Sequence, residues 1–233
     1  MTIEVHGSVE PGFEPVADAF ASAFADRPTM GAALHVTLGG QSIVDLWAGV
    51  ADERTRRPWV EDTPSVVFSC TKGLMSILIA RLVQDGRLDY DAPVARYWPE
   101  FAQAGKADIT VGQALAHQAG LSAPRENLTE DDIVDWDRMV AVLAAQEPLW
   151  PIGTGYAYHA LTHGWLTGEL VRRITGKSAG TYFRELIADP LEADAWIGLP
   201  DAQAARPAHL QVSAPLSALW ADEARKPAPN WPY

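Results

Sequence analysis

The decisive stretch of this chain is residues 66–74, which read Val-Val-Phe-Ser-Cys-Thr-Lys-Gly-Leu. It places Ser69 and Lys72 in the arrangement S-x-x-K, at the point where a helical pattern begins. One apolar face follows at helical spacing, formed by Leu74, Ile77, Leu78 and Leu82. The stretch therefore predicts a core helix that starts at Ser69 and ends at Asp85-Gly86.

The S-x-x-K spacing carries chemistry. Residues three apart lie on one helix face, so the Lys72 amine can reach the Ser69 hydroxyl. The positive end of a helix and partial burial both lower the pKa of a lysine, and a neutral lysine can take the serine proton. The first amides of the helix could donate to a developing oxyanion. The alternative is a serine that caps the helix beside a solvated lysine.

The pattern on either side predicts mostly helices. Residues 11–26 predict a helix, 32–38 and 42–47 a two-stranded hairpin, and the charged segment 49–64 a loop. Downstream helices are predicted at 110–117, 133–146, 161–175 and 178–188. Residues 224–233 show no periodicity and predict a tail or a cut loop. The chain thus offers two candidate strands.

Composition sets the class of protein. The chain has 233 residues, 48% of them hydrophobic and 21% charged, which excludes disorder, collagen and disulfide scaffolds. A net charge of −12 makes nucleic acid and anionic membranes unexpected partners. Cys70 is the single cysteine, no basic-then-apolar leader opens the sequence, and no apolar run approaches the roughly 20 residues that span a bilayer. We therefore expect a cytoplasmic protein.

Several segments in order carry a family resemblance. Residues 69–74 are followed by Asp-Gly-Arg-Leu-Asp-Tyr-Asp-Ala-Pro-Val at 85–94, by the Ile-Thr-Val and Leu-Ala-His-Gln-Ala-Gly-Leu segments of 109–121, and by Pro-Ile-Gly-Thr-Gly-Tyr-Ala-Tyr at 151–158. Together they resemble the penicillin-recognising, serine β-lactamase-like hydrolases. That superfamily contains class C β-lactamases, D-Ala-D-Ala carboxypeptidases and family VIII carboxylesterases, the last being the most similar group.

The resemblance implies an α+β fold, with an α/β sandwich beside an all-α domain and an antiparallel sheet flanked by helices. Residues 1–65 would form the N-terminal part of the α/β subdomain, 66–200 the mainly helical domain, and 201–233 an irregular tail or truncated connection. The family's third motif, K-T-G or its H-x-G and W-G-G variants, is not found. We therefore expect the sheet to be incomplete, with a C-terminal segment or a second chain completing it.

The resemblance also assigns site residues. Ser69 matches the acylated nucleophile and Lys72 its motif partner, while Tyr158 matches the tyrosine that acts as general base and acid. Tyr156, two residues earlier, is the competitor for that role. Ala160 stands where the second motif has an asparagine that holds a substrate amide, and this favours ester substrates.

The expected function is therefore a serine hydrolase that cleaves small carboxylic esters through an acyl-enzyme on Ser69. The alternatives are a β-lactamase or D-Ala-D-Ala carboxypeptidase, and a truncated or degenerate non-catalytic subunit. The histidines His117, His159 and His163 lack the spacing and companions of a metal site, so neither a metal nor a cofactor is expected. Cys70 is expected to be a small buried residue.

Overall fold

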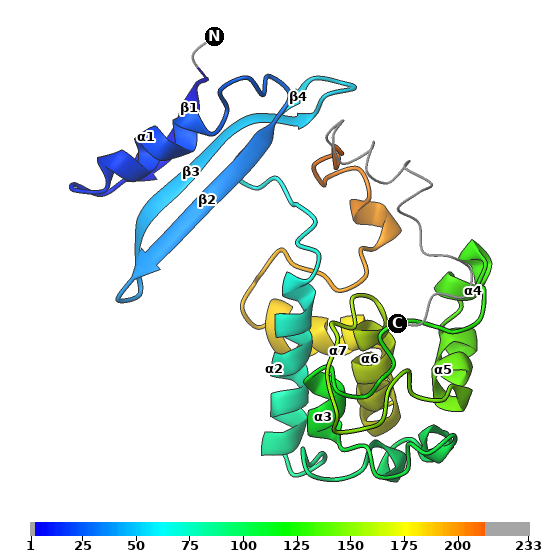
Figure 1. Ribbon diagram of the computed structural model, residues 1–233. Coiled ribbons are helices and arrows are strands. Elements are labelled where there is room, and N and C mark those ends of the chain that lie inside the picture. Colours follow the sequence, from blue (N-terminus) through cyan, green and yellow to red (C-terminus); the bar gives the residue numbers. More distant parts are fainter. Residues whose placement is uncertain (1–2, 213–233) are drawn as a thin grey trace. The chain divides into compact units, whose positions relative to one another are not determined.

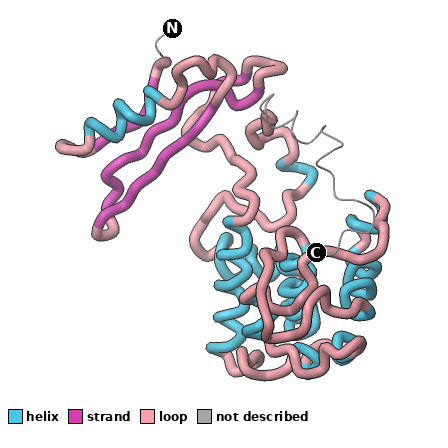
Figure 2. Tube along the Cα trace, in the orientation of Figure 1, coloured by secondary structure: helices cyan, strands magenta, loops and turns pink. Residues whose placement is uncertain are grey.

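The computed structural model describes residues 3–212, and the predicted tail at 224–233 lies outside them. The described chain divides into two compact units (Figures 1 and 2). Residues 3–66 together with 199–212 form the N-terminal unit, and residues 67–198 form the helical unit. The chain thus leaves the first unit just before Ser69 and returns to it after the last helix.

The N-terminal unit is built on an antiparallel sheet whose strand order is β1-β3-β2, with β4 pairing to β3. Its strands are β1 (Val5–Val9), β2 (Gly31–Leu38), β3 (Gln41–Asp52) and β4 (Arg57–Pro58). The hairpin prediction is confirmed, because β2 and β3 pair across the turn at 39–40. The expectation of two strands is wrong for the described residues. The segment predicted as a loop contains the end of β3 and all of β4, and β1 was not predicted.

Helix α1 (Glu14–Ser22), shorter than the predicted 11–26, lies beside β1. Beyond it the chain passes very close to β3. A Cβ atom on Gly49 would lie 2.0 Å from the Met30 carbonyl oxygen, and the backbone of Gly49 has a φ of +86°. Glycine is therefore needed at this point of the strand.

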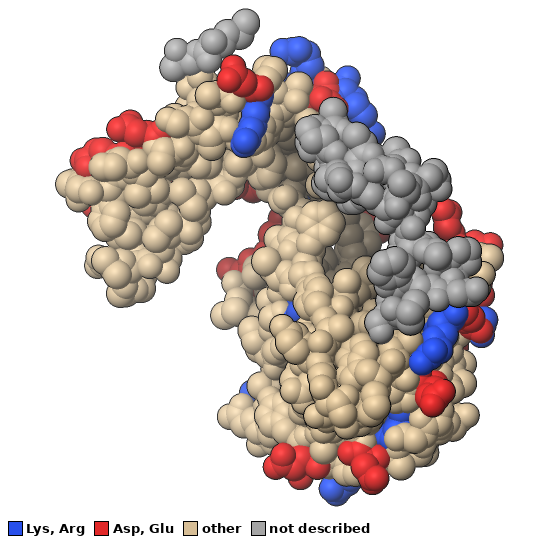
Figure 3. Space-filling view, in the orientation of Figure 1, with Lys and Arg blue, Asp and Glu red and all other residues tan. Residues whose placement is uncertain are grey.

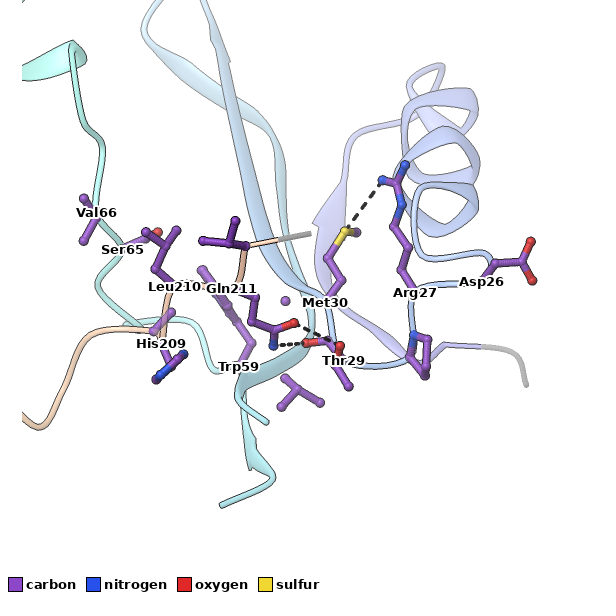
Figure 4. Close-up of a pocket in the computed structure, with 15 residues that line it drawn as sticks. Asp26, Arg27, Thr29, Met30, Trp59, Ser65, Val66, His209, Leu210 and Gln211 are labelled. Carbon is purple, nitrogen blue, oxygen red and sulfur yellow. Dashed lines mark hydrogen bonds between the residues drawn. The ribbon is translucent and has the colours of Figure 1, made fainter. Parts of the chain in front are cut away.

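A hollow of about 540 Å³ opens between the loop after α1 and the returning segment 208–212 (Figure 4). Gln211 seals one side of it by exchanging two hydrogen bonds with Thr29. The backbone of His209 also donates to the Ala51 carbonyl at 2.7 Å. Within the predicted tail, residues 201–212 contain one short 3-10 turn, Asp201–Gln203, and these contacts fasten their end to the sheet unit.

The helical unit consists of α2 (Cys70–Gln84), α3 (Val111–Leu115), α4 (Glu130–Val134), α5 (Trp136–Ala145), α6 (Thr162–Thr175) and α7 (Ala179–Phe183). Its 3-10 turns are Val94–Arg96 and Pro99–Ala102, and a π-helical turn spans Arg184–Ala188. The predicted helix 133–146 is two helices, because Asp135 leaves the helical conformation and caps α5 through the Arg138 amide.

The buried face of α2 differs from the predicted one. Leu78 and Leu82 are fully buried as expected, but Ile77 is 52% exposed, and Met75 and Ile79 take its place in the core. The predicted inward residues of α5 are confirmed, since Met139, Val140 and Leu143 are all buried. These side chains form one core with Trp98, Phe101, Leu166 and Leu170.

A buried lysine joins the loops of this unit. The Lys106 side chain is fully buried, and its Nζ donates to the carbonyls of Gln103 at 2.9 Å, Ala144 at 3.0 Å and Gln146. The Gln146 side chain in turn donates to the Ala123 carbonyl at 2.9 Å. Lys106 therefore ties the segment at Gln103 to the C-terminal end of α5, and Gln146 extends the connection to the loop around residue 123.

A buried carboxylate joins α5 to α6. Glu169 is fully buried and accepts hydrogen bonds from Arg172, Arg173 and the Trp136 indole. Burial alone would raise its pKa, but these donors outweigh burial and hold the pKa of Glu169 below its ordinary value.

Charged side chains of both signs are interspersed on the face drawn in Figure 3. Several of them are paired within the helical unit, as where Arg138 bridges Glu126 and Asp132. No helix among residues 3–212 is both long enough and apolar enough to cross a membrane.

Candidate active site

Ser69 occupies the N-cap position of α2, yet its side chain caps nothing. Instead, Lys72 Nζ donates to Ser69 Oγ at 3.1 Å, across one turn of the helix. The residue before it, Phe68, has a φ of +44°, a left-handed conformation that is strained for an aromatic residue. The turn thus presents an exposed serine hydroxyl whose hydrogen-bond partner is the lysine, and the interpretation of a capping serine is wrong.

The first amides of α2 do not fit the oxyanion role considered from the sequence. The N–H groups of Cys70, Thr71 and Lys72 already donate to the carbonyls of residues 67, 68 and 69, at 3.0–3.1 Å. The Ser69 N–H takes part in none of the backbone hydrogen bonds of the described residues. It is therefore the amide at this turn that can still donate to a substrate oxygen. Cys70 is exposed, so the expectation of a buried cysteine is also wrong.

Lys72 connects the nucleophile turn to the second motif. Its Nζ donates to the Ala160 carbonyl at 2.8 Å and lies 4.7 Å from the centre of the Tyr158 ring. Hydrogen bonding from Lys72, and then from Ser69, holds the pKa of Tyr158 below its ordinary value. The structure therefore brings Ser69, Lys72 and Tyr158 together, although Tyr158 lies far along the chain from the other two.

Tyr156, the competitor, lies elsewhere. It is 72% exposed, and none of the described ring or cation contacts joins it to Lys72. It lines a hollow of about 550 Å³ that also contains Tyr158 and Trp150. The loop that carries both tyrosines is braced by Trp150, whose indole N–H donates to the Gly155 carbonyl at 3.1 Å.

A second hollow, of about 300 Å³, opens beside Ala160 and shares Ser122 and Ala123 with the first. Its wall is mostly apolar and includes Pro124, Leu128, Ile133, Met139, Leu161 and Trp165. Ala160 lines this hollow, and its carbonyl accepts from Lys72 Nζ, which also donates to Ser69 Oγ, so two hydrogen bonds connect the wall of the hollow to the candidate nucleophile. An apolar group attached to a reacting carbonyl has a place to bind there.

A histidine cluster that the sequence did not predict lies beside Tyr158. The ring of His117 lies 4.9 Å from that of Tyr158, 5.5 Å from that of His159 and 4.9 Å from that of His163. The residue after Tyr158 is fully buried and satisfied: His159 Nε2 accepts from the Leu121 N–H at 3.0 Å, and its Nδ1 pairs with the Ala157 carbonyl at 2.7 Å. Burial lowers the pKa of His163 to about 4.

Three ring contacts converge on His117, so its surroundings differ from those of an ordinary surface histidine. The i, i+4 spacing of His159 and His163 was the available signal, but His159 lies before the start of α6, and the spacing carries no information about His117. Within residues 3–212, no group of three or more His, Cys, Asp or Glu side chains is arranged to hold a metal ion. The cluster is thus a set of packed imidazole rings that contacts the Tyr158 ring through His117.

Comparison with known proteins identifies the family. The Beta-lactamase family model matches residues 16–230. The chain is 46% identical over 201 residues to Esterase/beta-lactamase LipL of Mycobacterium tuberculosis, covering 86% of this chain and 46% of LipL. It superposes on a penicillin-binding protein homologue from Caulobacter crescentus with a TM-score of 0.87 and 45% identity, covering 91% of this chain and 57% of that one.

A solved family VIII carboxylesterase is similarly close, with a TM-score of 0.84 and 45% identity over 90% of this chain and 58% of the other. The chain spans about half the length of the curated relatives it matches. The nucleophile turn, the lysine and the tyrosine loop all fall within the matched residues. The chain belongs to the Beta-lactamase family.

Proposed function

We propose that this protein is a serine hydrolase that cleaves carboxylic esters through an acyl-enzyme on Ser69. The observation that carries the proposal is the position of Lys72, whose Nζ donates to Ser69 Oγ and lies 4.7 Å from the Tyr158 ring. Such a group can move a proton between nucleophile and leaving group without rearrangement of the backbone. The names of similar proteins, an esterase and a family VIII carboxylesterase, support the same class of reaction.

In the proposed reaction, Ser69 Oγ attacks the ester carbonyl and its proton passes to Tyr158, with Lys72 keeping the phenolate stable. The lowered pKa of Tyr158 suits this role, because the hydrogen bonds that lower it stabilise the phenolate form that accepts the proton. Tyr158 then returns the proton to the departing alcohol oxygen. Water hydrolyses the acyl-enzyme by the reverse proton path. The free Ser69 N–H is the proposed first donor to the oxyanion.

We expect ester rather than amide substrates because of Ala160 and the hollow that it lines. Alanine offers no side-chain amide to hold the peptide-like group of a penicillin or a D-Ala-D-Ala substrate. The apolar hollow of about 300 Å³ beside it suits an apolar acyl group. We therefore expect small esters with aliphatic acyl chains to react fastest.

The test compares hydrolysis of a short-chain p-nitrophenyl ester by the wild-type protein and by Ser69→Ala. The matched control is Ser76→Ala, which removes another hydroxyl from the same helix. That hydroxyl donates a hydrogen bond to the Lys72 carbonyl at 2.9 Å. We expect Ser69→Ala to lose at least about 10³-fold in rate and Ser76→Ala to stay near the wild-type rate. Equal rates in the wild-type protein and Ser69→Ala would rule out the proposal.

A β-lactamase activity is the second candidate, favoured by the double name of the LipL relative. Turnover of nitrocefin or covalent labelling by a fluorescent penicillin separates it from simple ester hydrolysis. If a fluorophosphonate probe fails to label Ser69, neither activity holds, and a non-catalytic subunit becomes the better interpretation.

The sheet supports one more proposal. In the described order β1-β3-β2, strand β2 is hydrogen-bonded along one edge only. We propose that a strand from residues outside 3–212, or from a second chain, pairs with the other edge and supplies the third motif. Hydrogen exchange tests this: the outward N–H groups of β2 should be protected in the active protein, and fast exchange would contradict the pairing.

A further inference from the structure

One residue holds the backbone on both sides of Tyr158. The Ala157 N–H donates to the His117 carbonyl at 3.4 Å, and the His159 N–H donates to His117 Nδ1 at 3.1 Å. The His117 ring also lies against the Tyr158 ring, with centroids 4.9 Å apart. A main-chain and a side-chain acceptor of the same residue therefore hold the N–H groups of the two residues that flank the tyrosine.

His117 occupies a backbone position that favours glycine. It follows α3, where the Gln118 N–H donates to the Gln113 carbonyl at 2.9 Å and the His117 N–H to the Ala114 carbonyl at 3.4 Å. This is a Schellman ending, whose left-handed residue is usually glycine. His117 fills it with a φ of +62°, a left-handed conformation that is unfavourable for a residue with a Cβ atom. The strain indicates that the side chain is needed for something other than ending the helix.

The electrostatic surroundings keep the His117 ring in the state that this contact needs. The titratable groups around the ring are Lys72, Tyr158, His159 and His163. Burial, and then the positive charge of Lys72, lowers the pKa of His117, so the ring is neutral at pH 7. A neutral ring that accepts at Nδ1 carries its proton on Nε2. Protonation would fill Nδ1 and break the bond to the His159 N–H.

We propose that His117 is a positioning residue, which fixes the Tyr158 loop so that the phenol stays within reach of Lys72 and Ser69. The inference rests on the proposed role of Tyr158, but its geometric core, the placement of Tyr158 beside Lys72, can be measured without turnover. His117 is not expected to touch the substrate or the reacting atoms.

Two substitutions separate this role from a purely structural one. His117→Gly relieves the left-handed backbone and removes the Nδ1 acceptor. His117→Asn tolerates the same backbone and offers Oδ1 as a replacement acceptor. The matched control is Ala104→Gly, which relieves another left-handed residue of the helical unit, with a φ of +52°, whose side chain is exposed.

The first measurement is the rate at which a fluorophosphonate labels Ser69, beside the urea stability of each protein. His117→Gly should remain folded, because relief of the left-handed backbone offsets part of the lost hydrogen bond, yet it should label about 10- to 100-fold more slowly, because the tyrosine is displaced. His117→Asn should recover most of the lost rate, and Ala104→Gly should label at the wild-type rate. Wild-type labelling by His117→Gly would overturn the inference.

The second measurement is the titration of Tyr158, followed by NMR of the chain with ¹³Cζ-labelled tyrosine and assigned with Tyr158→Phe. In His117→Gly the pKa of Tyr158 should rise toward its ordinary value, and in His117→Asn it should stay low. If the wild-type chain is never labelled but this rise occurs, the proposed function fails and the positioning role stands. An unchanged titration in His117→Gly refutes the positioning role whatever the labelling shows.

Discussion

Replacing Lys106 by methionine tests how the helical unit is held together. The substitution keeps most of the side-chain volume and removes the donor that serves the carbonyls of Gln103, Ala144 and Gln146. Each buried carbonyl left without a donor costs about 1 kcal/mol. The Gln103 carbonyl keeps the backbone N–H of Lys106 as a donor at 3.2 Å, so two buried carbonyls lose their donor. We therefore expect the free energy of unfolding of Lys106→Met to fall by about 2 kcal/mol, a large part of the stability of an ordinary domain.

The same substitution has a pH signature. Burial lowers the pKa of Lys106 to about 8 in the folded chain, whereas an exposed lysine titrates near pH 10.4. Between these values the unfolded chain holds more protons than the folded one, so the stability of the wild-type protein rises with pH. Lys106→Met lacks this contribution. The stability difference between the two proteins should therefore widen from pH 8 to pH 10.

The assay is urea unfolding followed by circular dichroism at pH 7.5 and 9.5. Lys177→Met serves as the control, because Lys177 is an exposed lysine paired with Glu185 and should change stability by less than about 1 kcal/mol. If Lys106→Met unfolds within about 0.5 kcal/mol of the wild-type protein at both pH values, the three carbonyl contacts are not stabilising and the reasoning is refuted.

Three further perturbations follow from the contacts above. Glu169→Gln should lower the free energy of unfolding by about 3 kcal/mol at pH 7. Because the wild-type carboxylate has a lowered pKa in the folded chain, its contribution is complete above about pH 4.3 and is lost as the pH falls through the folded-state pKa. In urea unfolding from pH 6 to pH 3, the free energy of unfolding should therefore fall less steeply for the variant than for the wild-type protein. Tyr158→Phe should slow ester hydrolysis by about 10²- to 10⁴-fold while Tyr156→Phe changes it little, and equal losses would reject the assignment of Tyr158. Gly49→Ala places a Cβ 2.0 Å from a carbonyl oxygen and should cost at least about 2 kcal/mol in a thermal melt; an unchanged melting temperature would show that β3 adjusts freely.

The hairpin and most helices could be predicted because local periodicity and turn glycines determine them. Strand β1 could not, since Val-His-Gly-Ser-Val has no clear alternation and its Gly7 is selected by a tertiary contact. A Cβ there would lie 1.9 Å from the Asp45 carbonyl of β3. Helical spacing also does not show which residues pack against α2, and this packing leaves Ile77 exposed. It likewise does not show that the Asp135 carboxylate caps α5 and so separates α4 from α5.

In the site, too, local contacts could be predicted from the sequence and tertiary contacts could not. Ser69 and Lys72 are three residues apart on one helix, so the spacing alone placed the amine beside the hydroxyl, as found at 3.1 Å. Tyr158 could be predicted only from the family resemblance, because a loop brings it to Lys72 and no local spacing indicates that contact. His117 was missed because its contact with the His159 amide depends on a left-handed helix ending, which composition and periodicity do not encode.

The division of the chain into two units has a consequence for its fluctuations. Ser69, Lys72 and Tyr158 all lie within residues 67–198, which have a core of their own. Transient opening of the strand unit leaves these three groups within one cooperative block, whereas opening of the helical block separates them. The fraction of molecules ready to acylate at any instant would then follow the unfolding equilibrium of that block, and amide exchange in α2 and α6 would report it directly.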